Sequence, residues 1–93
     1  MASAEGAFKV EYSRKAAKAL GKLDARDRAA ILAWVSKNLE GCDDPRAQGK
    51  PLAAGFKGQW RYRVGDYRLI AEIVDNRVVI IVLAIGHRKD IYR

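Results

Sequence analysis

Apolar and polar residues alternate with a period of two near the start of the chain. Directly after this segment, apolar residues recur every three or four positions, as they do on one face of a helix. Residues 7–12 show the alternation, which predicts a half-buried strand. Ser13 is a favourable N-cap for a helix over residues 14–22, whose apolar side chains share one face. Asp24 is a second N-cap, and another apolar face continues until Gly41 ends the second helix. The chain therefore begins with a predicted strand and a helical hairpin.

Three more strands are predicted in the second half of the chain. Residues 59–64 alternate, with aromatic side chains on one face and arginines on the other, and a Gly-Asp turn leads to a partner strand over residues 67–74. After an Asp-Asn turn, residues 78–85 are apolar at every position. Such a run is typical of a strand that is covered on both faces in the middle of a sheet.

The segment between the helices and these strands, residues 41–58, contains both prolines and several glycines, which predicts an irregular surface connection. The order of elements predicts an α+β fold in one domain over residues 1–93. Its N-terminal strand and helical hairpin precede a three-stranded antiparallel meander, and the helices pack on one face of the sheet.

Composition limits the function of this domain. There are 18 Lys and Arg residues against 11 Asp and Glu, a net charge of +7, so we expect an anionic partner, with nucleic acid first. A single cysteine, Cys42, excludes an internal disulfide framework and a cysteine-based zinc site. No apolar run is long enough to span a bilayer, and the N-terminus has no secretory signal. We expect a cytoplasmic protein without membrane anchor, metal or cofactor.

Arginines dominate the candidate chemistry. Arg61 and Arg63 share the polar face of one predicted strand, Arg68 follows the turn, and Arg88 follows the last strand. A guanidinium is always protonated and can form two hydrogen bonds to a phosphate, so a cluster of four predicts binding of an RNA or DNA backbone. The alternative is that outward arginines only keep strands near a sheet edge soluble and unpaired.

His87 and Tyr92 are the other candidates, both in the basic C-terminal segment. A histidine titrates near neutral pH and can act as a general acid or base, and a tyrosine can carry a proton or stack on a nucleobase. The alternative for a lone histidine after a strand is a structural or surface role. The sequence contains no Gly-rich phosphate loop between a strand and a helix.

Three segments together resemble the signature of the RelE/ParE toxin superfamily. These are the tripeptide Lys50-Pro51-Leu52, the segment GQWRYRVGDYRLI over residues 58–70 and the segment GHRKDIY over residues 86–92. The predicted order of elements agrees with the fold of this superfamily. Resemblance to its RelE branch implies a toxin that enters the ribosomal A site and cuts mRNA. In that branch the 2′-hydroxyl attacks the adjacent phosphorus and leaves a 2′,3′-cyclic phosphate.

The resemblance also implies roles for individual residues. Arg68 and Arg88 would bind the scissile phosphate, with Arg88 near the leaving oxygen, and Tyr92 would stack on or orient a base. We expect Lys57, which precedes one of the longer motifs, and Lys89, which lies within the other, to contact RNA as well.

Arg61 and Arg63, also expected to bind RNA, stand where a well-studied member of the superfamily has lysines. Arginine does not release its proton, so the general base is left to His87 or Tyr92, and we expect His87. The alternative is catalysis by positioning and electrostatics alone.

Two other functions stay open at this point. The ParE branch shares the fold but poisons DNA gyrase, and a basic RNA-binding module without catalysis would have the same charge. The resemblance implies that the partners are the ribosome with its mRNA and a cognate antitoxin. Such antitoxins are typically acidic and wrap the toxin with a helix and an extended segment, which gives a hetero-oligomer.

Overall fold

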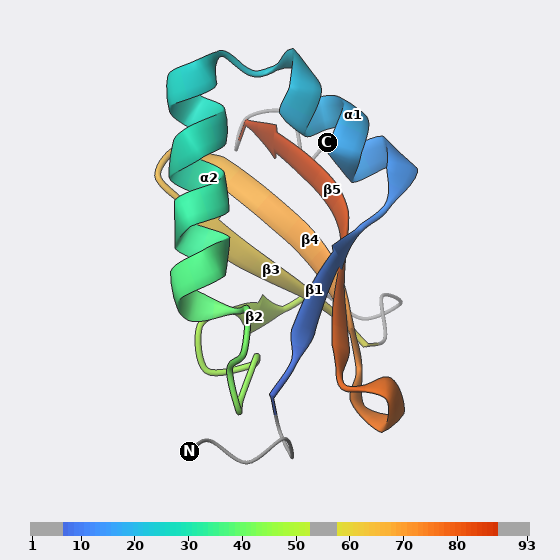
Figure 1. The fold of residues 1–93 in the computed structure, drawn as a ribbon. Coiled ribbons are helices and arrows are strands. Elements are labelled where there is room, and N and C mark those ends of the chain that lie inside the picture. The colour runs from blue at the N-terminus through green and yellow to red at the C-terminus, as the bar shows by residue number, and fades with distance from the viewer. Residues whose placement is uncertain (1–6, 53–57, 88–93) are drawn as a thin grey trace.

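Two helices cover one face of a five-stranded sheet in the computed structural model, which describes residues 7–52 and 58–87 (Figure 1). The elements are β1 (Lys9–Tyr12), α1 (Arg14–Lys22), α2 (Ala25–Asn38), β2 (Lys50–Pro51), β3 (Gln59–Val64), β4 (Tyr67–Val74), the 3₁₀ turn η1 (Asp75–Arg77) and β5 (Val79–His87). The strand order is β1-β5-β4-β3-β2, with β1 parallel to β5 and all other neighbours antiparallel. The predicted α+β fold is confirmed.

Side-chain caps begin both helices at the predicted residues. The Ser13 hydroxyl oxygen accepts a backbone N–H of α1 at 3.0 Å, and the Asp24 carboxylate accepts one of α2 at 2.9 Å. The Arg28 guanidinium donates to the Leu23 carbonyl at 2.8 Å and so ties α2 to the end of α1. The helical hairpin is therefore fixed by local hydrogen bonds as well as by its packing on the sheet. Within the described residues, neither helix is long and apolar enough to cross a membrane.

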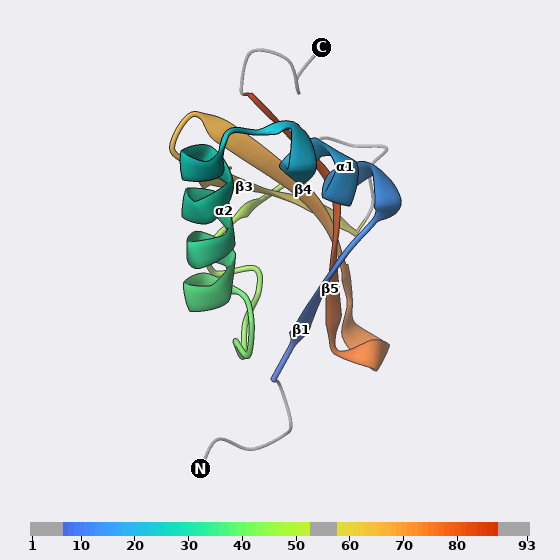
Figure 2. The same ribbon diagram turned by 45° about the horizontal axis from the view of Figure 1, so that its top comes forward.

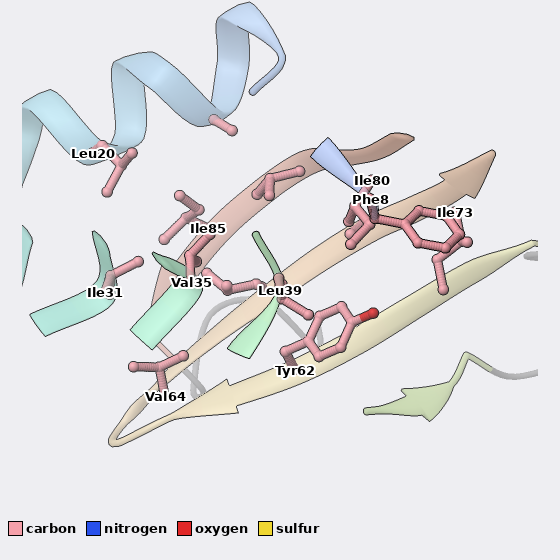
Figure 3. Packing of buried hydrophobic residues seen from close by; sticks show 14 residues of the cluster. Phe8, Leu20, Ile31, Val35, Leu39, Tyr62, Val64, Ile73, Ile80 and Ile85 are labelled. Atoms are coloured by element: carbon pink, nitrogen blue, oxygen red, sulfur yellow. The ribbon is translucent and has the colours of Figure 1, made fainter. Parts of the chain in front are cut away.

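The hydrophobic core fills the space between the helices and the sheet (Figure 3). Both helices lie on the same side of the sheet (Figure 2), so burial alternates along β4 and the second half of β3. In β3, Tyr62 and Val64 are buried toward the helices, whereas Arg63 is exposed on the other face. The alternation predicted for this strand is confirmed.

The prediction that residues 78–85 form the central strand, covered on both faces, is wrong. The middle strand is β4, and β5 lies between β4 and β1. Ile80 and Val82 are fully buried, but Ile81 and Leu83 are only half-buried, because both helices cover the same side.

A bulge in β5 reverses the direction of its side chains. Ala71 of β4 pairs with Val82, but the preceding Ile70 pairs with Ala84, so Leu83 is the additional residue. Ile85 is buried after the bulge, and His87, two residues later, follows it on the side that faces the helices. The bulge thus decides which face the end of β5 presents.

The turn before β5 is longer than predicted. Asp75, Asn76 and Arg77 form η1, and Val78 then adopts a left-handed conformation with φ of 55° and donates its N–H to the Asp75 carbonyl at 3.1 Å. The sequence has no glycine here to favour a two-residue turn. β5 therefore begins at Val79.

The prediction of an irregular connection over residues 41–58 is wrong at Lys50–Pro51, which pairs with β3 as an edge strand. An edge strand tolerates proline, since one side of it needs no N–H donors. The preceding turn is anchored to the sheet. The Tyr62 hydroxyl donates to the Pro45 carbonyl at 2.6 Å, and the Arg46 guanidinium forms two hydrogen bonds with the Asp75 carboxylate, at 2.7 and 3.1 Å.

Adjacent isoleucines in β5 provide a test of the one-sided core. We expect Ile80→Ala to lower the free energy of unfolding by about 2–5 kcal/mol, because it leaves a cavity in the core. Ile81→Ala should cost less, since Ile81 is only half-buried. Urea unfolding of both variants measures the difference, and equal losses would contradict the one-sided arrangement.

The buried Tyr62 predicts a loss of stability at alkaline pH. Burial raises the pKa of Tyr62 above the ordinary value near 10, so the unfolded chain ionises first and the folded state loses stability as pH rises above that value. Tyr62→Phe should cost about 0.5–1.5 kcal/mol at neutral pH, since it removes the hydrogen bond to Pro45. Its stability should then fall less steeply with pH than that of the wild type. Urea midpoints on either side of pH 10 compare the two, and parallel curves would refute this role of Tyr62.

Candidate functional site

Four cationic side chains from three strands line one hollow of about 430 Å³ beside the β2 edge of the sheet: Lys50, Arg61, Arg63 and Arg68. The strand register brings them together, because Lys50 pairs with Arg61 and Arg63 pairs with Arg68. Directly opposite residues point to the same face of a sheet, here the face away from the helices. The structure brings the three described arginines of the predicted cluster together here, and Lys50 joins them.

The opposite wall of the hollow is the turn at Ala47, Gln48 and Gly49. A Cβ atom on Gly49 would lie 2.6 Å from the Arg61 carbonyl oxygen and 2.7 Å from the Tyr62 ring, so only glycine allows this close approach. The ion pair of Arg46 with Asp75 holds the same turn in place. The guanidinium of Arg46 also lies 5.8 Å from the centre of the Trp60 ring.

Sequence reasoning gave no role to Lys50 or Gly49. Their signal was present, since Lys50 opens one of the three motif segments and Gly49 precedes it. Their segment reads as irregular, and only the pairing of β2 with β3 shows that Lys50 faces the arginines.

The charge in this hollow suits an anion. Arg63 and Arg68 are like charges on directly opposite residues, which destabilises a strand pair. None of the described residues that line the hollow is acidic. A bound phosphate would offset the repulsion and accept hydrogen bonds from the guanidinium groups. Arginines that served only to keep the sheet soluble would not need to converge in this way.

His87 lies in a different hollow, of about 400 Å³, between α2 and the turn that joins β3 to β4. Its ring meets the edge of the Tyr67 ring, with centroids 5.8 Å apart. The Tyr67 hydroxyl donates to the Asp27 carboxylate at 2.9 Å, and this hydrogen bond raises the pKa of Tyr67. Gly86, rather than His87, pairs with Arg68. The structure therefore does not bring His87 into the hollow of the arginines.

The remaining predicted site residues, Lys57, Arg88, Lys89 and Tyr92, lie outside the described residues, so their roles stay predictions. Within residues 7–52 and 58–87, no three His, Cys, Asp or Glu side chains gather in a group that could hold a metal ion.

Known proteins with a similar sequence or fold agree with these motifs and this architecture. The family model described as ParE toxin of the type II toxin-antitoxin system parDE matches residues 10–92. Toxin RelG of Mycobacterium tuberculosis is 34% identical over 86 residues, which cover 92% of this chain and 97% of the relative.

Solved structures give the same result. The toxin-antitoxin complex RelBE2 from M. tuberculosis contains a chain with 30% identity and a TM-score of 0.80, covering 95% of this chain and 98% of that one. The archaeal RelE-RelB complex from Pyrococcus horikoshii contains a chain with 26% identity and a TM-score of 0.70, covering 90% of this chain and 98% of that one. The resemblance drawn from the motifs is thus confirmed, and the chain belongs to the RelE/ParE superfamily as a toxin of a type II toxin-antitoxin system.

Proposed function

We propose that this toxin is a ribosome-dependent endoribonuclease that cuts mRNA in the A site. The observation that carries the proposal is the hollow in which Lys50 faces Arg61, Arg63 and Arg68. Its charge and its guanidinium groups fit an RNA phosphate better than a neutral metabolite. The similarity to toxins named RelG and RelE supports the same reading.

In the proposed reaction, the 2′-oxygen of a nucleotide attacks the adjacent phosphorus while the bond from phosphorus to the 5′-oxygen breaks. The products are a 2′,3′-cyclic phosphate and a 5′-hydroxyl, so a proton leaves the 2′-hydroxyl and another reaches the 5′-oxygen. Negative charge builds on the phosphoryl oxygens in the transition state. Arg61, Arg63 and Arg68 would stabilise that charge. Arg88, placed near the leaving oxygen by the motif resemblance, belongs to the same proposal.

We assign the protonation of the leaving 5′-oxygen to Lys50, while the proton of the 2′-hydroxyl passes to solvent water. A guanidinium keeps its protons, whereas the ammonium group of a lysine can donate one. Lys50 also lines the hollow of the arginines, and His87 lines another. This geometry favours Lys50 over His87 as the residue that transfers a proton. The motif resemblance, rather than the described geometry, supports a role for Tyr92 in stacking on a base.

A cognate antitoxin is the second proposed partner. The M. tuberculosis and P. horikoshii structures similar to this chain are complexes of a toxin with its antitoxin. We propose that this toxin likewise forms a hetero-oligomer with an acidic antitoxin, which wraps it with a helix and an extended segment. The net charge of +7 supports an acidic partner.

Poisoning of DNA gyrase is the alternative function. It is favoured by the description of the matching family model, which names the ParE toxin of parDE. The two functions differ in which nucleic acid is broken, so a single expression experiment separates them.

Mapping of RNA 5′ ends after expression of the chain tests the proposal. Cuts should appear within translated reading frames, disappear when the start codon is removed, and be suppressed by the co-expressed antitoxin. Arg68→Ala should abolish them, whereas Arg77→Ala, at an exposed arginine of η1 outside the hollow, should leave them. Equal cutting of untranslated RNA would remove the ribosome from the proposal. Gyrase–DNA cleavage complexes without RNA cuts would select the alternative.

Single-turnover cleavage on programmed ribosomes tests the proton transfer. Lys50→Gln should slow cleavage by about 10²–10⁴-fold, the usual effect of losing a general acid or base. Lys50→Arg keeps the positive charge but has a side chain that does not release its proton. It should therefore bind RNA better than Lys50→Gln without restoring the rate of cleavage. We expect His87→Gln to slow cleavage by less than about tenfold, since His87 lies outside the hollow. A severe His87→Gln with a mild Lys50→Gln would return the role to His87.

A further inference from the structure

Helix α1 carries a second concentration of positive charge, which we call the α1 stripe: Arg14, Lys15, Lys18 and Lys22. At 3.6 residues per turn, these side chains fall within an arc of about 100° on the helix surface. All four are exposed, whereas Ala16 and Leu20 on the other side of the helix are buried. The stripe lines a shallow hollow on the outside of α1.

Helix stability does not explain the α1 stripe. Arg14 and Lys15 occupy the first turn, where the helix dipole favours acidic residues, and this turn has none. Lys18 lies four residues from both Arg14 and Lys22, so like charges repel along the stripe. Lys22, in the last turn of α1, is the one member of the stripe that the helix dipole favours. The other helix, α2, has an acidic residue in its first turn as well as a basic one in its last. The stripe therefore opposes the stability of α1, as expected of a surface that meets an anionic partner.

The composition of the stripe indicates the class of partner. Lysine is depleted in protein–protein interfaces, which are anchored by aromatic and apolar residues. Binding of single-stranded RNA relies on aromatic side chains on which bases stack, and α1 contains none. Insertion into a membrane surface needs an exposed apolar face, but the apolar face of α1 is buried in the core. Contacts of lysine and arginine with a regular row of phosphates need none of these features.

We propose that the α1 stripe binds the phosphate backbone of double-helical RNA, without regard to sequence. Successive cations at four-residue spacing rise by about 6 Å along the axis of α1, and so present a regular array to the phosphates of a duplex. Each phosphate contact would release counterions, which makes this binding strongly salt-dependent.

This surface is separate from the hollow of Lys50 and the arginines. α1 packs on β5 and β1. The hollow is lined by Lys50 of β2, and β2 forms the opposite edge of the sheet from β1 (Figure 1). Both helices cover one face of the sheet (Figure 2), and Arg61 and Arg63 lie on the other, because their neighbour Tyr62 is buried toward the helices. RNA bound in the hollow would therefore leave the α1 stripe open to a second, duplex segment. The inference thus goes beyond the proposed cleavage and does not depend on it.

Salt-dependent binding of the purified full chain to a blunt RNA duplex of arbitrary sequence tests the proposal. The triple variant Lys15→Gln, Lys18→Gln, Lys22→Gln should bind the duplex about tenfold or more weakly. The slope of log affinity against log salt should also fall by about two to three, because three phosphate contacts are lost. Its melting temperature should not fall, since the substitutions relieve repulsion on an exposed face.

A matched control removes the same number of charges elsewhere. Arg26→Gln, Lys37→Gln and Arg77→Gln lie at exposed positions on α2 and η1, and this variant should keep the wild-type slope. An equal loss of duplex affinity in both triple variants would show that only net charge matters and would overturn the proposal. An unchanged salt slope in the α1 variant would also overturn it. So would a variant that keeps duplex binding but loses binding to a poly-glutamate peptide or to anionic lipid vesicles.

Discussion

The burial of one face of the sheet under both helices is the constraint on which the rest of the structure depends. Because side chains alternate along a strand, burying Tyr62 and Val64 against the helices forces Arg61 and Arg63 onto the opposite face. The ladder then places Arg68 and Lys50 on that face as well. The shared cationic face is thus a consequence of how the core is built.

The turn that closes this hollow depends on the same core. Tyr62 contributes its ring to the core and its hydroxyl to the hydrogen bond with the Pro45 carbonyl, so one residue joins the helices, the sheet and the turn. Gly49 then packs directly against the backbone of β3, and Arg46 is held by Asp75 beyond the far end of β4. The position of Lys50 follows from these contacts, since β2 begins immediately after Gly49.

Two surfaces of this toxin bring like charges close together. Arg63 and Arg68 face one another across a strand pair, and the α1 stripe repeats like charges along a helix. An anionic partner lowers this repulsion, so its binding is linked to the stability of the folded toxin. The proposed partners, RNA and an acidic antitoxin, both supply negative charge. Competition between them for the cations of the hollow would give an antitoxin a physical means of inhibition.

The sequence by itself determined the elements that depend on local patterns. The caps at Ser13 and Asp24, the alternation of β3 and the three-strand meander were all readable, because capping and two-residue periodicity act within a few positions of the chain. The motifs around Arg61, Arg63 and Arg68 were also sufficient to indicate the superfamily.

Only the tertiary structure decided which residues share a hollow. The bulge at Leu83 turns His87 toward the helices, whereas uninterrupted alternation from Ile80 would have placed it on the face of the arginines. Pairing of Lys50 with Arg61 depends on a contact between distant segments, and no local pattern in the glycine- and proline-containing connection specifies it. The physical reason is the same in both cases. Strand register and bulges are set by packing across the whole sheet, and a shift of one residue moves a side chain to the opposite face.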